Sequence, residues 1–169
     1  MSFYPKNPNL SQLIQTSVSG VNVDRGFLAH FQVSAANAVA AAAAGVHAAV
    51  TDNGSEQEIT TNITNPAVPR NVTATAGGTA GDIKAIQVTV EGTDIEGNAI
   101  SETLPAFTVD TAGSVVGSKA FATITKITIP AHDGNGATTS IGWGDKLGLP
   151  YKLAHNTVLA AYLDNTLEG

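Results

Sequence analysis

Alternating apolar and polar residues predict β-structure in the middle of the chain. Within Lys84–Gly92 every second position from Ile86 onward is apolar, and a second strand-like run follows at Asn98–Leu104. Because the connector 93–97 contains Asp and Gly, which favour tight turns, the two runs are predicted to pair as an antiparallel hairpin. The segment Lys119–Ile129 is rich in β-branched residues and is followed by a proline, so it is predicted to form one long strand.

Shorter segments on both sides of this region have the same period of two. The predicted strands are Phe27–Val33, Val46–Thr51, Glu58–Thr64, Asn71–Ala76, Thr138–Trp143 and Asn156–Leu163. Gly77–Asp82 is predicted to be a flexible loop and Gly144–Gly148 a turn. Many short strands separated by regularly spaced turns indicate a mainly β fold, an antiparallel β-sandwich or barrel.

The alanine-rich run Ser34–Ala44 allows two interpretations. Alanine is the strongest helix former and Ser34 can cap a helix N-terminus, so a short helix is the first expectation. Its small side chains would bury little area, however, and closely packed small-residue strands are the alternative. Gly45 ends the element in either case.

The first 26 residues differ from the rest of the chain. Two prolines and several Asn and Gln residues give a polar opening that would gain little from ordering itself. We therefore expect an extended N-terminal arm at 1–26 followed by a single β domain at 27–169. One apolar group, Leu10, Leu13 and Ile14, could form an amphipathic turn that binds another surface, such as a neighbouring subunit; a frayed terminus is the alternative.

Composition narrows the range of partners. Only 13% of the 169 residues are charged, about half the usual share, and the net charge is −6. A surface with so few charges suits packing against partner subunits. Eight Lys and Arg residues make no basic footprint, so no nucleic-acid partner is expected. No membrane partner is expected either, since the alanine-rich stretch is too weakly apolar to span a bilayer.

The N-terminus lacks the basic and apolar regions of a secretory signal, which predicts synthesis in the cytoplasm. Cysteine is absent from the chain, which excludes disulfides, thiolate metal sites and cysteine nucleophiles.

Candidate chemistry is sparse. The loop His132–Gly136 combines a histidine, a carboxylate and an amide, and could bind calcium, but it lacks a second carboxylate, and a plain surface turn is the better interpretation. Asp94 and Asp145 each lie near glycine, where Asp is a common turn residue. The four histidines, His30, His47, His132 and His155, have no metal-ligand spacing. We therefore predict no catalytic, cofactor or metal site, no small-molecule substrate, and no enzymatic activity.

The single tryptophan, Trp143, lies between two glycines. It can anchor the core or insert into a pocket of a partner, and the core is favoured because the chain has few large side chains with which to fill a β core.

Three segments resemble a module of tailed-bacteriophage virion structural proteins. The first is "GDIKAIQVTVEGTDIEGNAISETLPAFTVDTAGSVVGSKAFATITKITIP" at 81–130, the second is "IGWGDKLGLPY" at 141–151, and the third is the upstream "ITNPAVPRNVTAT" at 63–75. The resemblance covers roughly 46–153, and its motifs are turn-and-strand patterns without catalytic residues.

This resemblance implies a structural role in the virion, most plausibly as a head decoration (auxiliary capsid) protein. Its partners would then be the major capsid protein and copies of itself, as a trimer by analogy, after synthesis in the host bacterial cytoplasm. A tail-tube, tail-terminator or head-completion ring protein is the first alternative. A carbohydrate-binding β-sandwich is the second, although it would require several exposed aromatic residues.

Position and apolarity select the residues expected to make contacts. The expected contacts of the arm with the capsid are Phe3, Tyr4, Leu10, Leu13 and Ile14. The expected contacts between subunits are Trp143, Leu147, Leu149 and Tyr151.

Overall fold

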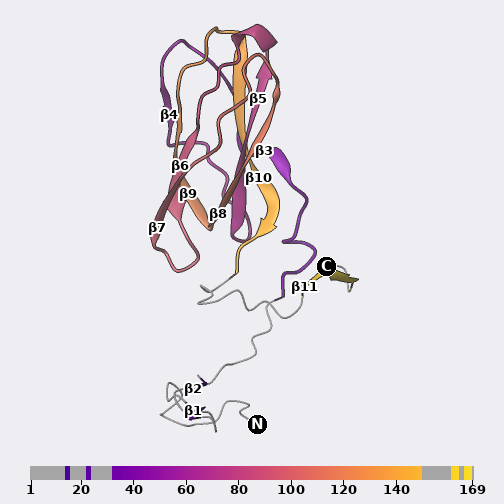
Figure 1. Cartoon of the computed structure of the whole chain (residues 1–169). Helices are drawn as coiled ribbons and strands as arrows, with labels where there is room; N and C mark the ends of the chain where they lie inside the picture. Colours follow the sequence, from indigo (N-terminus) through magenta and orange to yellow (C-terminus); the bar gives the residue numbers. More distant parts are fainter. Residues whose placement is uncertain (1–13, 16–21, 24–31, 150–160, 164–165, 169) are drawn as a thin grey trace. The chain divides into compact units, whose positions relative to one another are not determined.

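Two antiparallel four-stranded sheets form a sandwich around one hydrophobic core (Figure 1). The computed structural model describes residues 14–15, 22–23, 32–149, 161–163 and 166–168. The first sheet has the order β3-β10-β5-β8 and the second the order β4-β9-β6-β7. The predicted mainly β, antiparallel fold is confirmed, and its two sheets stay open rather than closing into a barrel within the described residues.

The strands differ widely in length. The first sheet consists of β3 (Ala42–Thr51), β10 (Ala137–Leu147), β5 (Arg70–Gly78) and β8 (Gly113–Phe121). The second consists of β4 (Gln57–Ile59), β9 (Thr123–Ile129), β6 (Thr89–Thr93) and β7 (Ala99–Thr103). A 3-10 turn, η1 (Ala80–Asp82), follows β5, and it is the only helical element among the described residues. No helix among the described residues is long and apolar enough to cross a membrane.

Two short ladders lie outside the sandwich sheets. β1 (Ile14–Gln15) pairs with β2 (Asn22–Val23), and β11 (Ala161–Leu163) pairs with β12 (Thr166–Glu168). The chain divides into two units, 1–32 and 33–169. Most of the predicted arm and most of the predicted strands 27–33 and 156–163 lie outside the described residues, so those predictions stay open.

The core draws its side chains from both sheets. Its largest fully buried members are Phe121, Ile83, Leu104, Ile127, Ile141, Val46, Val72, Val88 and Val90. In β6 the burial alternates along the strand, as the hydrophobic period of two predicts, whereas in β9 a register shift separates the buried Ile124 from the buried Ile127 and Ile129. Each large aliphatic side chain that leaves water contributes about 1.5–3 kcal/mol, so this shared core is what holds the sheets together.

The predicted hairpin is confirmed in its pairing as β6 and β7, which pair from Thr89↔Thr103 to Thr93↔Ala99, but its first strand begins at Thr89 and not at Lys84. Asp94 builds the turn, because its Oδ1 accepts the backbone N–H groups of Glu96 and Asn98, each at 2.9 Å. Gly97 completes it in a left-handed conformation with φ of 84°. The side-chain hydrogen bond from Asn98, followed by the backbone donors, lowers the pKa of Asp94.

The single long strand predicted at 119–129 is wrong. The chain leaves the first sheet at the end of β8 and enters the second at the start of β9, and the N–H of Ala122 between them donates to the carbonyl of Thr93 at 2.8 Å. Phe121 and Ile124 are both buried although they are three positions apart, which breaks the period of two. Strand propensity is high on both sides of the break, and therefore hid it.

The helix expected at Ser34–Ala44 is also wrong. The backbone makes one turn, in which the N–H groups of Asn37 and Ala38 donate to the carbonyl of Ser34, and β3 then begins at Ala42. An alanine helix would have had no large side chains to bury, whereas an extended alanine segment can lie close to another strand. Ala42, Ala43 and Ala44 belong to β3, as the alternative of small-residue strands predicts, but β3 continues through Gly45 to Thr51, so the prediction that Gly45 ends the element is wrong.

Two turn predictions also need correction. The predicted turn at Gly144–Gly148 is largely strand, since β10 continues to Leu147. It does so with a register shift against β5, where the side-chain oxygen of Asn71 accepts the N–H of Lys146 at 3.0 Å. The predicted loop at Gly77–Asp82 holds the end of β5 and η1. Both segments are ordered by side-chain hydrogen bonds and by pairing with a neighbouring strand. The local glycine content, on which the turn predictions rest, reveals neither kind of interaction.

Candidate interaction surface

An uncharged segment before and within β3, which we name the strap (residues 39–43), lies across the outer face of β10. A Cβ on Gly142 would meet the carbonyl oxygen of Ala42 at 1.9 Å, so the strap occupies the space above that glycine. Ser140, on the same face, donates from Oγ to the carbonyl of Ala43 at 3.0 Å. Between the pairs Ile141↔His47 and Trp143↔Ala42, β3 has four residues where β10 has only Gly142, and this excess lets β3 cross over β10.

Three more side chains of the sandwich hold the strap. Arg70 Nη1 donates to the carbonyl of Val39, Trp143 Nε1 donates to the carbonyl of Ala40 at 3.2 Å, and Asp145 Oδ1 accepts the N–H of Ala41 at 3.2 Å. The strap is thus held by side-chain hydrogen bonds in place of a regular backbone ladder. Strap residues need no large side chain for this, which is why alanine suffices there.

Arg70 is the most deeply buried cation of this surface. It is 3% exposed, and no described carboxylate lies within ion-pair distance of it. Its Nε is buried without a hydrogen-bond partner in the described part of the chain. A buried guanidinium is costly to desolvate, so its bond to the carbonyl of Val39 is a charge-assisted contact that fixes the entry of the strap.

Trp143 contacts its own chain. It is half-buried and packs against the hydrophobic core, and its ring lies over Gly45. A Cβ at Gly45 would come within 2.8 to 2.9 Å of three indole atoms, so only glycine fits beneath the ring. These contacts fit the prediction that Trp143 anchors the core better than the prediction that it inserts into a partner. The ring already packs on Gly45, and the indole N–H already donates to the carbonyl of Ala40.

A shallow depression lies beside the strap on the outer face of the first sheet. Ala41 and Ala43 of the strap border it. The rest of its lining consists of Asn71, Thr73, Thr75, Ser114, Val116, Trp143, Gly144, Asp145 and Lys146. Thr75 and Ser114 share a hydrogen bond of 2.7 Å across the strands. Val116 is 50% exposed. These groups can exchange hydrogen bonds and make apolar contacts with a partner.

Exposed apolar residues also gather at the end of the sandwich where the β6–β7 turn and the end of β10 lie together (Figure 1). Ile95 and Leu149 line a second shallow depression with Pro69 and Ala120. Ile95 is 44% exposed and Leu149 is 40% exposed. Gly148 holds the end of β10 in place by donating its N–H to the carbonyl of Pro69 at 2.8 Å.

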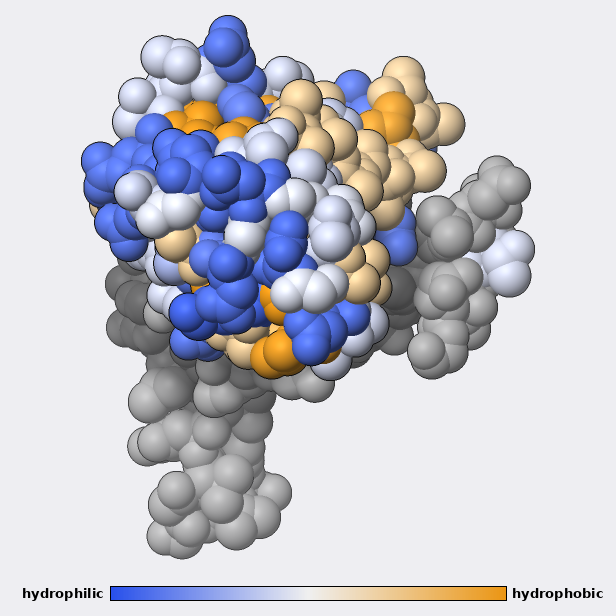
Figure 2. All heavy atoms as spheres, turned by 90° about the horizontal axis from the view of Figure 1, so that it is seen from above, coloured by the Kyte–Doolittle hydropathy of each residue, from blue (hydrophilic) through white to orange (hydrophobic). Residues whose placement is uncertain are grey.

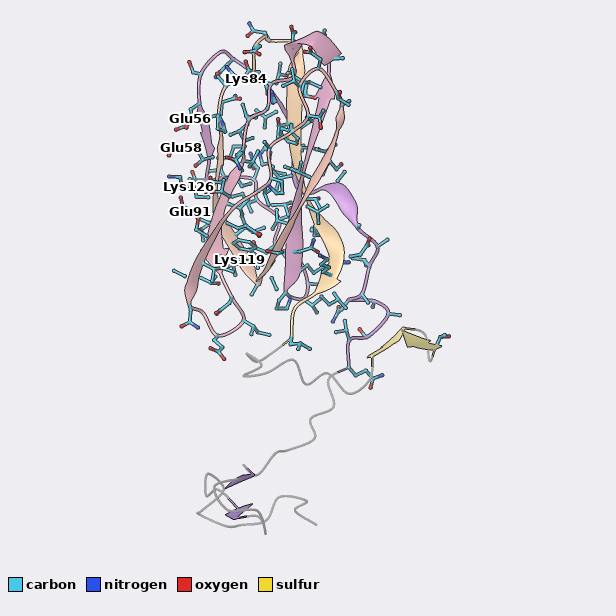
Figure 3. All side chains as sticks on the ribbon, in the orientation of Figure 1. Glu56, Glu58, Lys84, Glu91, Lys119 and Lys126 are labelled. Atoms are coloured by element: carbon cyan, nitrogen blue, oxygen red, sulfur yellow. The ribbon has the colours of Figure 1, made fainter. Side chains whose placement is uncertain are left out.

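Charge is distributed unevenly over the two sheets. On the second sheet Lys126 of β9 forms ion pairs with Glu58 at 2.7 Å and Glu91 at 3.7 Å, which lie on its neighbouring strands β4 and β6 (Figure 3). The hydrogen bond that the Lys126 ammonium donates to the Glu58 carboxylate raises the pKa of Lys126. No charged residue occurs between Gln32 and Thr51, where the exposed side chains are mostly alanine. Seen along the sandwich, moderately hydrophobic residues form a band on one side while hydrophilic residues gather elsewhere (Figure 2).

The residues predicted to make contacts have different fates. Phe3, Tyr4, Leu10, Leu13 and Tyr151 lie outside the described residues. Ile14 is in β1, opposite Val23. Leu147, like Leu149, is 40% exposed, so both are free to meet a partner, whereas Trp143 faces its own chain. The sequence analysis missed Arg70, Ser140 and the strap itself, and only the alanine run without charges signalled that segment.

The loop His132–Gly136 uses its polar groups to hold itself in place. Asp133 forms an ion pair with Lys84 at 3.1 Å, and the carboxylate of Asp82 accepts the N–H of Gly136 at 2.9 Å. Within residues 32–149 and the short described ladders, no group of three or more His, Cys, Asp or Glu could hold a metal ion. His132 is buried rather than exposed, at 6%.

Comparison with known proteins adds no name to this surface. No protein-family model, no curated protein and no solved structure matches the chain.

Proposed function

We propose that this chain is a structural protein of a tailed-bacteriophage particle, a head decoration protein that binds the major capsid protein and copies of itself. The support for this proposal is the resemblance of the sequence motifs to those of virion proteins, and the glycines of these motifs have a structural role in the sandwich. A Cβ on Gly92 would meet the carbonyl oxygen of Thr123 at 1.9 Å, and one on Gly117 would meet the Glu102 carboxylate at 2.7 Å. The motif "V-x-G-T-D" lies on β6 and its turn, and "G-x-K-A-F" ends β8.

The observation that carries the proposal is the strap, an uncharged segment beside which the exposed Asp145 and Lys146 contribute one charge of each sign. Exposed alanines together with Val39, which is 45% exposed, form a neutral surface on a framework whose backbone is well tied. A protein that clads a shell must repeat one modest contact many times, and a neutral, rigid face can do so without strong like-charge repulsion between acidic copies.

The test is deletion of the gene from the genome that encodes the chain, followed by electron microscopy of the particles. Intact heads that have lost surface knobs, restored by adding back the purified protein, are the expected result. Tailless or unsealed heads would instead support the ring-forming tail or head-completion alternative. Light scattering of the purified chain adds a second readout, because a trimer has three times and a hexameric ring six times the 17.1 kDa of one chain.

The carbohydrate-binding alternative receives little support from the strap side. Sugar recognition uses exposed aromatic faces, and the one tryptophan lies over Gly45 and donates its N–H to Ala40. This alternative would be supported if particles that carry the protein bound glycans and particles that lack it did not.

A further inference from the structure

A buried histidine joins three segments at the end of the sandwich where β3, β5 and β9 finish and β10 begins. The ring of His132 stacks on Phe107, with centroids 6.1 Å apart and an angle of 27° between the planes. The side chain reaches both the segment after η1 and β10, because Nδ1 lies 3.2 Å from the backbone nitrogen of Lys84 and Nε2 lies 2.9 Å from Oγ1 of Thr139.

These two contacts admit only the neutral form of the imidazole. A backbone N–H can only donate, so Nδ1 must carry a lone pair to accept from Lys84, and the ring proton is therefore on Nε2, which donates to Thr139. A second proton on Nδ1 would point at the N–H of Lys84. Ring protonation thus removes one hydrogen bond and sets two donors against each other in a buried place.

The charged groups around the ring come from each neighbouring segment. Asp52, in the turn after β3, accepts the backbone N–H of His132 at 2.9 Å and that of Gly54 at 2.8 Å. Asp133 pairs with the ammonium of Lys84, and Asp82 of η1 accepts the N–H of Gly136. Asp110, on the Phe107 segment, is exposed. Each of these carboxylates is already engaged or in water, and none accepts a hydrogen bond from the ring.

Burial and the carboxylates therefore act in opposite directions on the ring. Desolvation is the larger effect and lowers the pKa of His132, while Asp52 and Asp133 raise it in part. Because the folded form holds its proton less tightly than an open form with an ordinary pKa of about 6.5, the contribution of this site to stability is complete above that pH. It is lost progressively as the pH falls below about 6.5 toward the lowered value.

We propose that His132 is an acid-sensitive latch, which in its neutral form ties the segment at Lys84 to the loop 131–136 and on uptake of one proton releases them. The sheets themselves stay paired, because the core side chains of both sheets lie between them, and of these Phe107 stacks on the ring. Acid then opens this one end of the sandwich and leaves the strap side closed.

The test is hydrogen exchange of the folded full-length chain, corrected for intrinsic rates, between about pH 7.5 and about pH 5. The amides of Lys84 and His132 should lose protection by about tenfold for each pH unit below the ordinary histidine pKa, until the folded pKa is reached. The amides of β6 and β9 should keep theirs. Protection of Lys84 that is unchanged over this range would overturn the proposal.

Two variants make the result specific. His132→Asn keeps an acceptor for the N–H of Lys84 and has nothing to titrate, so its loop protection should not depend on pH. His47→Asn is the matched control, because His47 is half-buried in β3 and contacts only the carbonyl of Ala48 through its ring; it should retain the full pH response. If His132→Asn does not fold, the ring signals of the unaltered chain decide instead: a pKa of His132 at or above about 6.5 refutes the latch.

Discussion

Replacing Gly142 by alanine should dislodge the strap. The new Cβ would lie 1.9 Å from the carbonyl oxygen of Ala42 and 2.7 Å from the carbonyl carbon of Ala43. These are backbone atoms, so no side-chain rotation relieves the contact. Non-bonded carbon atoms prefer separations of about 3.5 to 4.0 Å, and the strap must therefore rise by more than about 1 Å.

The magnitude follows from what that displacement breaks. The hydrogen bonds that Ser140, Trp143 and Asp145 make to the strap are 3.0 to 3.2 Å long, near the upper end of the normal range. A further 1 Å removes all three. At about 1 kcal/mol each, the free energy of unfolding should fall by about 3 kcal/mol, which is a large fraction of the stability of an ordinary domain.

Urea unfolding followed by the fluorescence of Trp143 measures this loss, since the chain has no other tryptophan. The matched control is Gly113→Ala, which lies in β8 of the same sheet and would meet nothing within 4 Å. The control should be as stable as the unaltered chain or slightly more stable. If Gly142→Ala unfolds at the same urea concentration as Gly113→Ala, and the N–H of Ala41 exchanges no faster, these three hydrogen bonds do not hold the strap against β10.

Two further substitutions test the sandwich. Phe121→Ala removes the largest fully buried side chain of the described residues and should lower the free energy of unfolding by about 3–5 kcal/mol. Val116 is half-exposed on the same strand, so Val116→Ala should change the free energy of unfolding by less than about 0.5 kcal/mol. Similar losses at both sites would contradict the core assignment. The Glu102 carboxylate on β7 accepts hydrogen bonds from the N–H and hydroxyl of Ser118 and from the N–H of Lys119, both on β8. Glu102→Ala should therefore lower the free energy of unfolding by about 1–3 kcal/mol and speed hydrogen exchange at both amides, with Glu102→Gln intermediate. Unchanged exchange would show that this bridge between the sheets is dispensable.

The parts of the fold that sequence reasoning recovered are those that a period of two controls. In the β6–β7 hairpin, alternate residues must face the core, and the Asp-Gly chemistry of the turn is local, so both signals can be read from a few neighbouring residues. The proposed place in a virion stays a prediction.

The wrong secondary-structure predictions concern segments whose conformation depends on residues far away in the sequence. Lys119–Ile129 has strand propensity throughout, but its two halves belong to different sheets, because Phe121 and Ile124 must both point into the core. The alanine run follows helix propensity locally, yet extended backbone there gains hydrogen bonds from side chains that lie about 30 and 100 positions further along the chain. Propensity cannot register such distant donors.

Taken alone, the sequence determined the class of structure and its surface character: an antiparallel β fold, an interior of β-branched residues, and an exterior poor in charge. Tertiary structure alone decided where the chain changes sheet, that an alanine segment becomes a strap over Gly142, and that His132 is buried and neutral. The physical reason is range. Hydrophobic period and turn chemistry act over a few residues, whereas close approach of backbones, buried hydrogen bonds and desolvation depend on residues that only folding brings together.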